Sequence, residues 1–422
     1  MLIEIIPATR LPRKISSFTY KVPPEFESLI KVGQIVEINL RNKNTTGLII
    51  KIQKQNSLHK FKIKEINKIL FPQPLITSTQ IKLIQYMADS CGISPAIVVK
   101  SLLPDVPKKQ KNIKTINQKN TKAKKQKNSK TNYFWYENEK IAIDFIKKKI
   151  TKNKGQILIL VPEKSCIDYL IKKLNLTQSK VIKNYAQIAK VKFFKNYLEI
   201  LSKKNKIIIG TKISVLLPFS NLQKIIVWDE QNWNHKQSEI NPRFDAREIA
   251  TWIKQEHKSN LTYLSPAPSV EKYSTINQKI KKTKKQKNKI NIINLQTERL
   301  KGNYSFLSDE LIHNIQATLK KNKKIFIFHN RKGLANYIFC DDCGQIFKCP
   351  ECQISLTYHL EDKLLHCHHC NYKTETPPLC PKCSKANIKF KGQGAEKIEL
   401  EIKKEFKNIK NSKQITIGTQ AV

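Results

Sequence analysis

The sequence predicts a multidomain α/β protein, and three observations carry that prediction. Near the N-terminus, apolar and polar residues alternate on both sides of a turn, which is typical of a β-hairpin. Further along, short apolar runs alternate with amphipathic stretches, the pattern of a parallel sheet covered by helices. Four CxxC pairs then fall between Cys340 and Cys383. The length of 422 residues is enough for roughly two to four domains with separate cores.

The overall charge predicts a polyanionic partner. The chain has 78 Lys and Arg against 33 Asp and Glu, a formal net charge of +45. Such a balance favours contacts with phosphate groups and the release of counterions. The alternative is that much of the lysine is solvated surface, because lysine, asparagine and isoleucine are abundant throughout, as in a chain encoded by AT-rich codons.

The N-terminal stretch "MLIEIIPATRLPRK" has no apolar segment followed by a small-residue cleavage site. No run approaches the roughly 18 uninterrupted apolar residues that a membrane span needs. We therefore expect a cytosolic, reducing compartment and no membrane partner. In that compartment CxxC pairs indicate metal ligands rather than disulfides.

The first expected domain covers residues 1–105. Its hairpin is "GQIVEINLRNKNTTGLIIKI", and "STQIKLIQYMADSCGISPAIVVKSLLP" follows with helical spacing that Pro104 ends. Residues 106–131 are rich in lysine and nearly free of apolar side chains. Because such a stretch cannot form a core, it predicts a disordered basic linker.

Residues 132–275 predict the parallel sheet. The expected strands end in polar or turn residues, in the stretches "QILILVPE", "KIIIGTK", "KIIVWDE" and "LTYLSPAPS". Ligands of such sheets bind at the carboxyl ends of the strands, where these polar residues fall. A second basic linker is expected at residues 276–299, and from residue 300 a helix-then-strand pattern predicts a second α/β unit.

The cysteine spacing predicts two structural zinc sites. Each CxxC pair places two thiolates on one turn, and four thiolates close a tetrahedral Zn²⁺ site without an open position for catalysis. The eight expected ligands are Cys340, Cys343, Cys349, Cys352, Cys367, Cys370, Cys380 and Cys383. Consecutive and nested pairing are both sterically possible. The nearby His359, His366, His368 and His369 are expected to be solvated or to support the ligands rather than to bind metal.

Several stretches, in this order, resemble the primosomal protein N′ (PriA replication-restart helicase) family: "LVPEK", "IIIGTKISVLLPF", "IIVWDEQN", "NPRFDAREIA", "LSPAPS", "FIFHNRKGLANYIFCDDCG", "LHCHHC" and "KGQGAEKIELEI". The N-terminal "FTYKVP", "VGQIVEINL" and "LLPDVP" look like that family's 3′-DNA-binding domain. The resemblance implies an N-terminal β-rich 3′-DNA-binding domain, a degenerate RecA-like helicase lobe, a zinc-binding insertion with two four-cysteine sites, and a partial second lobe.

The division expected from the resemblance has seven segments. A 3′-DNA-binding-like domain is expected at residues 1–105, a basic linker at 106–131, lobe 1 at 132–275 and a second basic linker at 276–299. The start of lobe 2 is expected at 300–336, a double-zinc module at 337–386 and a truncated remnant of lobe 2 at 387–422.

The resemblance also implies roles for particular residues. Family members recognise stalled or branched forks, unwind DNA 3′ to 5′ with ATP and help to reload the replicative helicase. Nested pairing of the cysteines would place the first and last CxxC pairs on one ion and the two middle pairs on the other. Phe18 and Tyr20 match positions at the DNA 3′ end, although Thr19 replaces the family's aspartate. Arg243 and Arg247 either line the DNA channel or form ion pairs within the lobe.

The nucleotide site departs from the family. A P-loop needs glycines, a lysine and a Ser/Thr, but no glycine occurs between Gly92 and Gly155 and no GK[ST] is present. Asp229 and Glu230 match the acidic Walker-B pair and are interpreted as vestigial. ATP and Mg²⁺ are therefore doubtful cofactors.

Neighbouring residues differ as well. Gln231 and Asn232 replace Glu-His, and Pro266 replaces an alanine of the coupling motif. The aromatic residues 134–136 are hypothesised to fill the vacated nucleotide pocket with apolar surface, and two tryptophans near the acidic pair, Trp228 and Trp233, are expected to pack in the core. The chain stops at "ITIGTQAV", so the second lobe is expected to be truncated.

The leading functional prediction is a DNA-binding protein of replication restart and primosome assembly, without its own ATPase motor. Its expected partners are branched DNA and primosome or helicase-loading proteins, in the cytoplasm with the nucleoid. One alternative is an active ATP-dependent 3′–5′ helicase with a divergent nucleotide site, against which the missing glycines argue. Another is a non-functional truncated paralogue, against which the eight retained cysteines argue.

Overall fold

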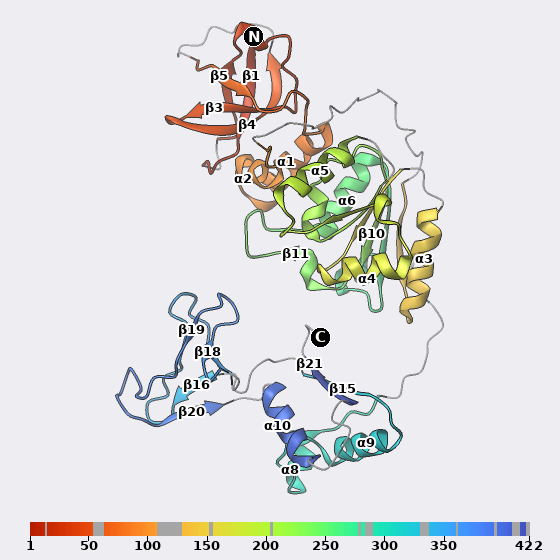
Figure 1. The fold of residues 1–422 in the computed structure, drawn as a ribbon, viewed down its shortest axis with the longest axis vertical. Helices are drawn as coiled ribbons and strands as arrows, with labels where there is room; N and C mark the ends of the chain where they lie inside the picture. The colour runs from red at the N-terminus through yellow and green to blue at the C-terminus, as the bar shows by residue number, and fades with distance from the viewer. Residues whose placement is uncertain are drawn as a thin grey trace. The chain divides into compact units, whose positions relative to one another are not determined.

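The computed structural model divides the chain into two compact units, Met1–Lys287 and Asn288–Val422, each described here by itself (Figure 1). It describes residues 1–12, 15–53, 63–107, 129–151, 155–202, 206–276, 280–282, 290–329, 337–359, 362–391, 395–406 and 414–418. Most of the first expected basic linker, residues 277–279 and 283–289 of the second, and residues 330–336 lie outside these ranges, so the domain boundaries set there stay predictions.

The N-terminal sheet is antiparallel, with strand order β2-β1-β4-β3-β5. Its strands are β1 (Leu2–Pro7), β2 (Phe18–Lys21), β3 (Ile35–Leu40), β4 (Lys43–Gln53) and β5 (Ile66–Ile69). The predicted hairpin is present as β3 and β4, and it turns at Arg41 and Asn42, both at positive φ (51° and 60°). Two such residues in a row are the geometry of a type I′ turn, whose twist matches that of the strands it joins.

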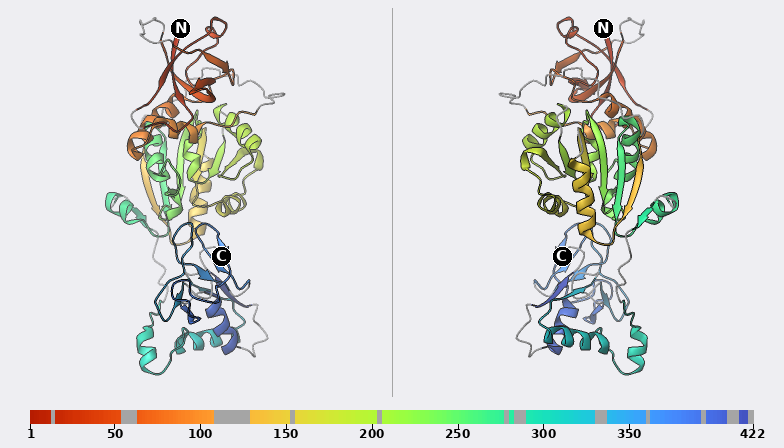
Figure 2. Two further views of the ribbon diagram at one scale, coloured as in Figure 1. Left: turned by 90° about the vertical axis from the view of Figure 1, so that its left-hand side faces the viewer. Right: turned by 90° about the vertical axis from the view of Figure 1, so that its right-hand side faces the viewer.

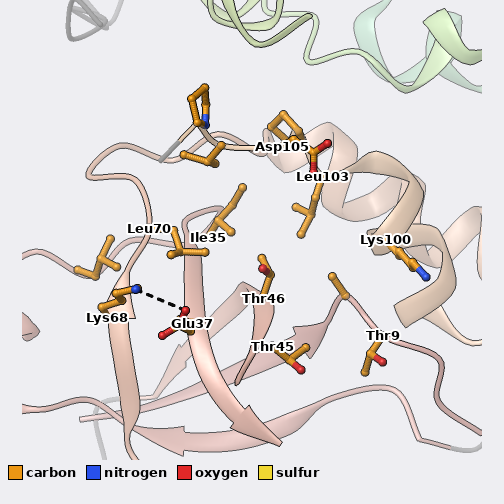
Figure 3. Close-up of a pocket in the computed structure, with 15 residues that line it drawn as sticks. Thr9, Ile35, Glu37, Thr45, Thr46, Lys68, Leu70, Lys100, Leu103 and Asp105 are labelled. Carbon is orange, nitrogen blue, oxygen red and sulfur yellow. Dashed lines mark ion pairs between the residues drawn. The ribbon is translucent and has the colours of Figure 1, made fainter. Parts of the chain in front are cut away.

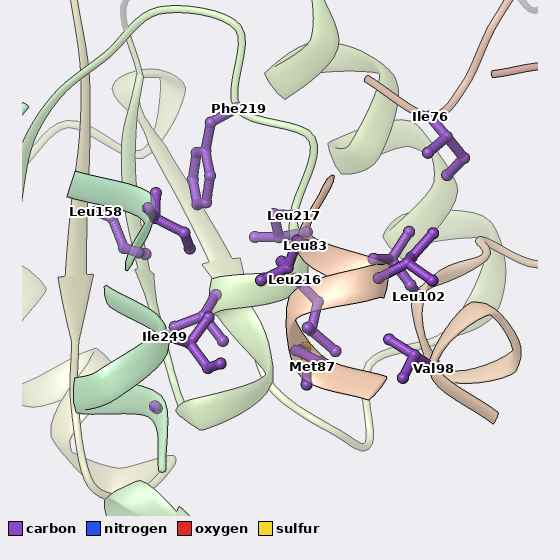
Figure 4. Packing of buried hydrophobic residues seen from close by; sticks show 14 of the residues in the cluster. Ile76, Leu83, Met87, Val98, Leu102, Leu158, Leu216, Leu217, Phe219 and Ile249 are labelled. Atoms are coloured by element: carbon purple, nitrogen blue, oxygen red, sulfur yellow. The ribbon is translucent and has the colours of Figure 1, made fainter. Parts of the chain in front are cut away.

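Two helices connect this sheet to the rest of the first unit. Helix α1 (Ser78–Cys91) begins with a capping box between Thr77 and Gln80 and ends at Gly92, and α2 (Pro95–Leu102) follows. The apolar side chains of α1 and α2, including Leu83 and Met87, share one core cluster with Leu216 and Leu217 of the next domain (Figure 4). The Gln80 amide also donates to the Leu216 carbonyl at 2.8 Å. One core cluster of the first unit therefore contains side chains of both the N-terminal domain and the α/β lobe.

The predicted parallel sheet is present and has seven strands, in the order β14-β6-β13-β10-β7-β9-β8. They are β6 (Thr131–Trp135), β7 (Gln156–Leu160), β8 (Val181–Asn184), β9 (Ile207–Gly210), β10 (Leu222–Trp228), β13 (Asn260–Ser265) and β14 (Ile280–Lys282). Strand β7 is buried along its whole length, because helices cover both faces of the sheet.

The covering helices form two separate apolar layers (Figure 2). Helices α3 (Glu139–Thr151) and α4 (Ser165–Leu174) pack on one face, while α5 (Lys190–Leu201) and α6 (Ala246–His257) pack on the other. A two-stranded ribbon of β11 (Lys236–Gln237) and β12 (Phe244–Asp245) precedes α6, and the short α7 (Val270–Ile276) follows β13.

The second unit contains an α/β part and a cysteine module. In the α/β part, β15 (Ile325–Phe328) pairs in parallel with β21 (Ile415–Gly418), and the helices are α8 (Leu295–Leu300), α9 (Asp309–Lys320) and α10 (Ala395–Glu405). The isoleucines of both strands pack against the helices, whereas Phe326 and Phe328 are 54% and 56% exposed.

The cysteine module is built from short antiparallel pairs. Strand β16 (Tyr337–Cys340) pairs with β20 (Ile388–Lys391), and a three-stranded sheet contains β17 (Thr357–Tyr358), β18 (Leu365–His366) and β19 (Lys373–Thr374). The module has its own small core, which includes Ile338, Phe347, Leu356 and Leu365.

Candidate functional site

The acidic pair lies at the carboxyl edge of the seven-stranded sheet, directly after β10. Asp229 has a positive φ of 50°, a conformation that aspartate tolerates better than most residues. Its Oδ1 accepts a hydrogen bond of 2.7 Å from the hydroxyl of Tyr136, the residue that follows β6. The Tyr136 ring is buried and stacks on Trp228 with the ring centroids 5.7 Å apart. One carboxylate oxygen of the pair is thus engaged by an aromatic residue of the chain.

Burial dominates the electrostatics of this contact. Burial raises the pKa of Asp229 above its usual range, against the opposing effect of the Tyr136 hydrogen bond. Burial, and next the charge of Asp229, also raises the pKa of the Tyr136 hydroxyl, which keeps it a donor at neutral pH.

Glu230 is fully buried, and both of its carboxylate oxygens are occupied. Oε2 accepts from the Tyr133 hydroxyl at 3.0 Å and from the Ser269 backbone N–H at 3.2 Å. Oε1 accepts from the Ser269 hydroxyl at 2.5 Å and lies 3.5 Å from Nη1 of Arg247. The carboxylate therefore joins β6, β10, α6 and the turn after β13.

Arg247 forms buried ion pairs within the lobe. Its side chain is 8% exposed, and its guanidinium donates from Nη2 to Oδ2 of Asp245 at 2.6 Å and from Nη1 to the Glu230 carbonyl at 2.7 Å. A guanidinium enclosed in this way cannot reach a DNA phosphate without breaking these contacts. Arg243 is exposed, and its carbonyl accepts a hydrogen bond from the Cys91 thiol.

The connection between β6 and α3 is too short for a phosphate-binding loop. Only residues 136–138 join the two elements, and none of them is glycine. The Asn138 side chain accepts from the Lys140 backbone N–H at 2.8 Å and so caps α3. A P-loop instead is a glycine-rich loop that presents several backbone N–H groups to the phosphates.

The three aromatic residues expected to fill the nucleotide pocket have separate positions. Of these three residues, Tyr136 bonds the acidic pair, through its hydroxyl to Asp229. Phe134 stacks on Phe145 of α3 with the centroids 4.5 Å apart, and the Trp135 indole N–H donates to the Pro266 carbonyl at 2.6 Å. A fourth residue, Tyr133, was not expected at the site and bonds Glu230.

The prediction that both tryptophans pack in the core is correct for Trp228 and wrong for Trp233. Trp228 is buried between the sheet and Tyr136, whereas Trp233 is 66% exposed. The Lys236 ammonium lies 4.4 Å from the centroid of the Trp233 ring. Trp233 is exposed because the chain leaves the sheet in a short 3₁₀ turn after Asn232.

The two aromatic residues expected at the DNA 3′ end are part of the N-terminal sheet. Tyr20 is buried, and its hydroxyl donates to the Asn39 carbonyl at 3.0 Å; burial raises its pKa. Phe18 is partly buried. The Lys64 ammonium, which the sequence did not single out, donates to the side chain of the same Asn39 at 3.2 Å.

A cavity of about 1000 Å³ lies between this sheet and the end of α2 (Figure 3). Neither Phe18 nor Tyr20 lines it. It is lined by threonines, apolar side chains, two lysines and two carboxylates. Nζ of Lys68 lies 3.5 Å from Oε2 of Glu37, and the two form an ion pair.

The eight cysteines form two groups of four, and within each group the Sγ atoms lie within 4.8 Å of one another. The groups are Cys340, Cys343, Cys380 and Cys383, and Cys349, Cys352, Cys367 and Cys370. This is the nested arrangement that the resemblance implied. It brings together pairs far apart in sequence because β16 and β20 pair at the base of the module.

The two sulfur groups fit zinc. Sγ–Sγ distances such as 3.5 Å for Cys340–Cys383 and 3.4 Å for Cys349–Cys370 are close to the ~3.8 Å edge of a tetrahedron with Zn–S bonds of about 2.3 Å. Backbone N–H donors, that of Cys370 first, lower the pKa of the Cys367 thiol, whereas burial and hydrogen bonds to neighbouring thiols raise the pKa of Cys370, so the four sulfur atoms interact closely with one another. The histidines lie outside both groups: His359 contacts His368, and His366 contacts Asp362.

Comparisons with known proteins agree with this architecture. Residues 8–104 match the family model of the PriA 3′DNA-binding domain, and residues 349–374 match that of the PriA DNA helicase Cys-rich region. The replication restart protein PriA of Borreliella burgdorferi is 31% identical over 399 residues, which cover 87% of this chain and 60% of that protein. The proteins of the same name from Bacillus subtilis and Rickettsia conorii are 28% and 27% identical, over 63% and 93% of this chain and 34% and 64% of theirs.

The two matched domains and the α/β lobe between them give this chain a domain composition like that of the PriA proteins it matches. The chain belongs to the PriA family, of which it is a divergent member. It spans about 60% of the length of the Borreliella relative. Within the part of the chain that the structure describes, no helix is long and apolar enough to cross a membrane.

Proposed function

We propose that this protein binds branched DNA during replication restart or primosome assembly, and that it does so without hydrolysing ATP. Its match to the 3′DNA-binding domain, its family and its charge of +45 support the DNA-binding part. The single observation that carries the second part is the occupation of the acidic pair by Tyr133 and Tyr136.

An ATP-hydrolysing site needs carboxylate oxygens that are open to Mg²⁺ and to the attacking water. Here Glu230 has four contacts within the protein, and Asp229 is bonded to Tyr136. Freeing Glu230 would leave buried donors unpaired, at a cost of about 1–3 kcal/mol each. The three-residue connection before α3 also offers no glycine-rich cradle for phosphates.

We further propose that each sulfur group holds one Zn²⁺ ion, two in total, in a structural role. Four thiolates close the coordination shell and leave no position for a reacting water. The proposed partners are forked or branched DNA and the proteins that assemble a primosome or load a helicase, in the nucleoid of the cytoplasm.

The deciding experiment measures ATP hydrolysis and fork binding in one sample of the zinc-loaded protein. The proposal expects binding of a forked oligonucleotide by fluorescence anisotropy, and no hydrolysis above the rate of a D229A/E230A variant. Hydrolysis that the double substitution abolishes would show an active helicase motor and contradict the proposal. Absence of fork binding by a folded, zinc-loaded sample would contradict the DNA-binding part and favour a non-functional paralogue.

A further inference from the structure

A small lysine-lined cavity lies at the amino edge of the seven-stranded sheet. Its volume is about 150 Å³, below the roughly 300–1,000 Å³ typical of small-molecule sites but enough for a single phosphate group. Strands β6, β10 and β13 begin around it, so it lies at the opposite edge of the sheet from Asp229 and Glu230. Its polar lining consists of Lys130, Lys149, Lys224, Asn132, Asn260 and Thr262.

The three lysines reach this cavity from three different elements. Lys130 directly precedes β6, Lys224 lies near the start of β10, and Lys149 lies in the last turn of α3. The Lys224 ammonium donates to the Lys149 carbonyl at 2.5 Å. The Lys149 ammonium lies 5.2 Å from the centroid of the Phe145 ring.

A purely structural role explains only part of this arrangement. Lysines often satisfy the last carbonyls of a helix, and their aliphatic stems often cover apolar surface. That role accounts for the hydrogen bond from Lys224 to α3. It does not account for a third cation at the same cavity, since like charges repel and each would be more stable in water.

The number of lysines is not the distinguishing feature, because the chain is rich in lysine throughout. The distinguishing feature is the missing counter-charge. The cavity beside the N-terminal sheet contains Glu37 and Asp105 with its two lysines, and a third cavity, beside Trp233, contains Asp245 and Glu248 with Lys236 and Arg243.

The small cavity, in contrast, has no carboxylate among its described lining residues. Among the described residues, none of its three lysines forms an ion pair with a carboxylate. The Lys224 ammonium contacts a carbonyl, and the Lys149 ammonium lies over an aromatic ring. Burial, and next the charge of Lys149, lowers the pKa of Lys224, as expected where positive charges meet without compensation.

We propose that this cavity binds a phosphate of a nucleic-acid backbone, with Lys130, Lys149 and Lys224 as its cationic contacts. Ammonium groups bind phosphate oxygens as point charges, and the hydroxyl and amide groups of the lining add hydrogen-bond partners. A phosphate contact positions a strand without reading its sequence. The inference rests on the proposed DNA binding and adds a contact site on the lobe, separate from the 3′DNA-binding domain.

The test compares two double variants that remove the same charge. K149Q/K224Q removes two contacts of the cavity, whereas K192Q/K195Q removes two exposed lysines of α5 for which the structure records no partner among the described residues. Binding of a fluorescein-labelled fork is measured by anisotropy from 50 to 200 mM KCl. Loss of two phosphate contacts should reduce the slope of log K against log[salt] by about 1.4–1.8 and weaken binding at 100 mM by about tenfold. The α5 variant should change the slope by less than about 0.5.

Equal slopes for the two variants would overturn the inference while leaving the proposed DNA binding intact. Failure of the wild-type protein to bind the fork would instead remove the proposed function itself.

Lysine acetylation of the wild-type protein gives a second readout that does not depend on variants. Fork DNA should protect Lys149 and Lys224, but not Lys192 and Lys195, from an N-hydroxysuccinimide acetate reagent, as measured by peptide mass spectrometry. Equal labelling with and without the fork would contradict the inference.

A last measurement tests whether the cavity binds a nucleic-acid phosphate or a free phosphate ion. Inorganic phosphate at 10 mM, compared with chloride at the same ionic strength, should give no protection of Lys149 and Lys224. Full protection by inorganic phosphate alone would assign the cavity to a free anion and overturn the nucleic-acid assignment.

Discussion

At the residue scale, two tyrosine hydroxyl groups bond the acidic pair at the carboxyl edge of the sheet. Tyr133 and Tyr136 come from the same strand end, and each bonds one member of the acidic pair. Both carboxylate oxygens of Glu230 and Oδ1 of Asp229 accept hydrogen bonds within the protein. Through these contacts the acidic pair links β10 to β6 across the intervening β13.

Asp229 should make the stability of the first unit depend on pH. Since burial raises its folded pKa above the unfolded value, the native state holds this proton more tightly, and the contribution to the free energy of unfolding falls as pH rises through the folded pKa. D229N removes the titration, so its stability relative to wild type should increase from pH 4.5 to pH 7. Urea unfolding at both pH values, with D144N on the exposed face of α3 as the control, measures this. A constant difference across the range would contradict it.

A buried arginine, Arg247, and an exposed one, Arg243, can be compared by the effect of their substitution on the free energy of unfolding. R247L leaves Glu230 and Asp245 buried beside an apolar side chain, so it should lower the free energy of unfolding by about 3–5 kcal/mol. R243L changes an exposed side chain and should cost less than about 0.5 kcal/mol. Denaturant unfolding followed by tryptophan fluorescence compares them. Similar losses in the two variants would mean that the Arg247 ion pairs do not stabilise the fold.

At the scale of elements, the cysteine module depends on pairs of strands that are far apart in sequence. Strands β16 and β20 bring the first and last CxxC turns together, and the three-stranded sheet brings the two middle turns together. The small apolar core of the module cannot supply much stability alone, so metal binding should be coupled to its folding.

Zinc content can distinguish nested from consecutive pairing. C349S/C370S removes two ligands of one sulfur group, so one Zn²⁺ per chain should remain by mass spectrometry of the metal. In consecutive pairing the same substitutions would damage both sites, and little zinc would remain. C340S/C380S is the corresponding control in the other group and should also leave one ion. Loss of both ions in either variant would contradict the nested grouping.

At the scale of the whole molecule, the first unit joins a β-rich domain to an α/β lobe through one continuous core. Met87 and Leu83 of α1 belong to the same cluster as side chains of the lobe, and Gln80 bonds the lobe backbone. Such an interface resembles an interior rather than a transient contact, so the two domains should unfold together.

Substitution of Met87 tests whether the N-terminal domain and the lobe unfold together. M87A should lower the stability of the N-terminal domain and of the lobe in a single transition, by about 2–5 kcal/mol, because Met87 is fully buried. L29A, at a side chain exposed to 54%, should leave the transition almost unchanged. Calorimetry combined with hydrogen exchange of each domain follows both. Loss of protection in the N-terminal domain alone would show that the two domains unfold independently.

The sequence predicted what depends on local patterns. Fully apolar runs predicted the parallel strands, alternation predicted the β3–β4 hairpin, and CxxC spacing predicted the sulfur sites. It did not predict the contacts of Tyr133 with Glu230, because these depend on which strands are neighbours and in what register. The cavity at the amino edge was hidden for a different reason: in a chain so rich in lysine, only the three-dimensional positions of the carboxylates distinguish one cluster from another.

The exposed phenylalanines of β15 affect how the protein behaves at high concentration. Phe326 and Phe328 lie on the face of a two-stranded parallel sheet that the helices of the second unit do not cover. Parallel sheets are normally shielded on both faces, and an open apolar strand favours association with other strands. We expect this pair to limit the solubility of the purified protein, and mild detergent or a phenylalanine-to-lysine substitution to raise that limit.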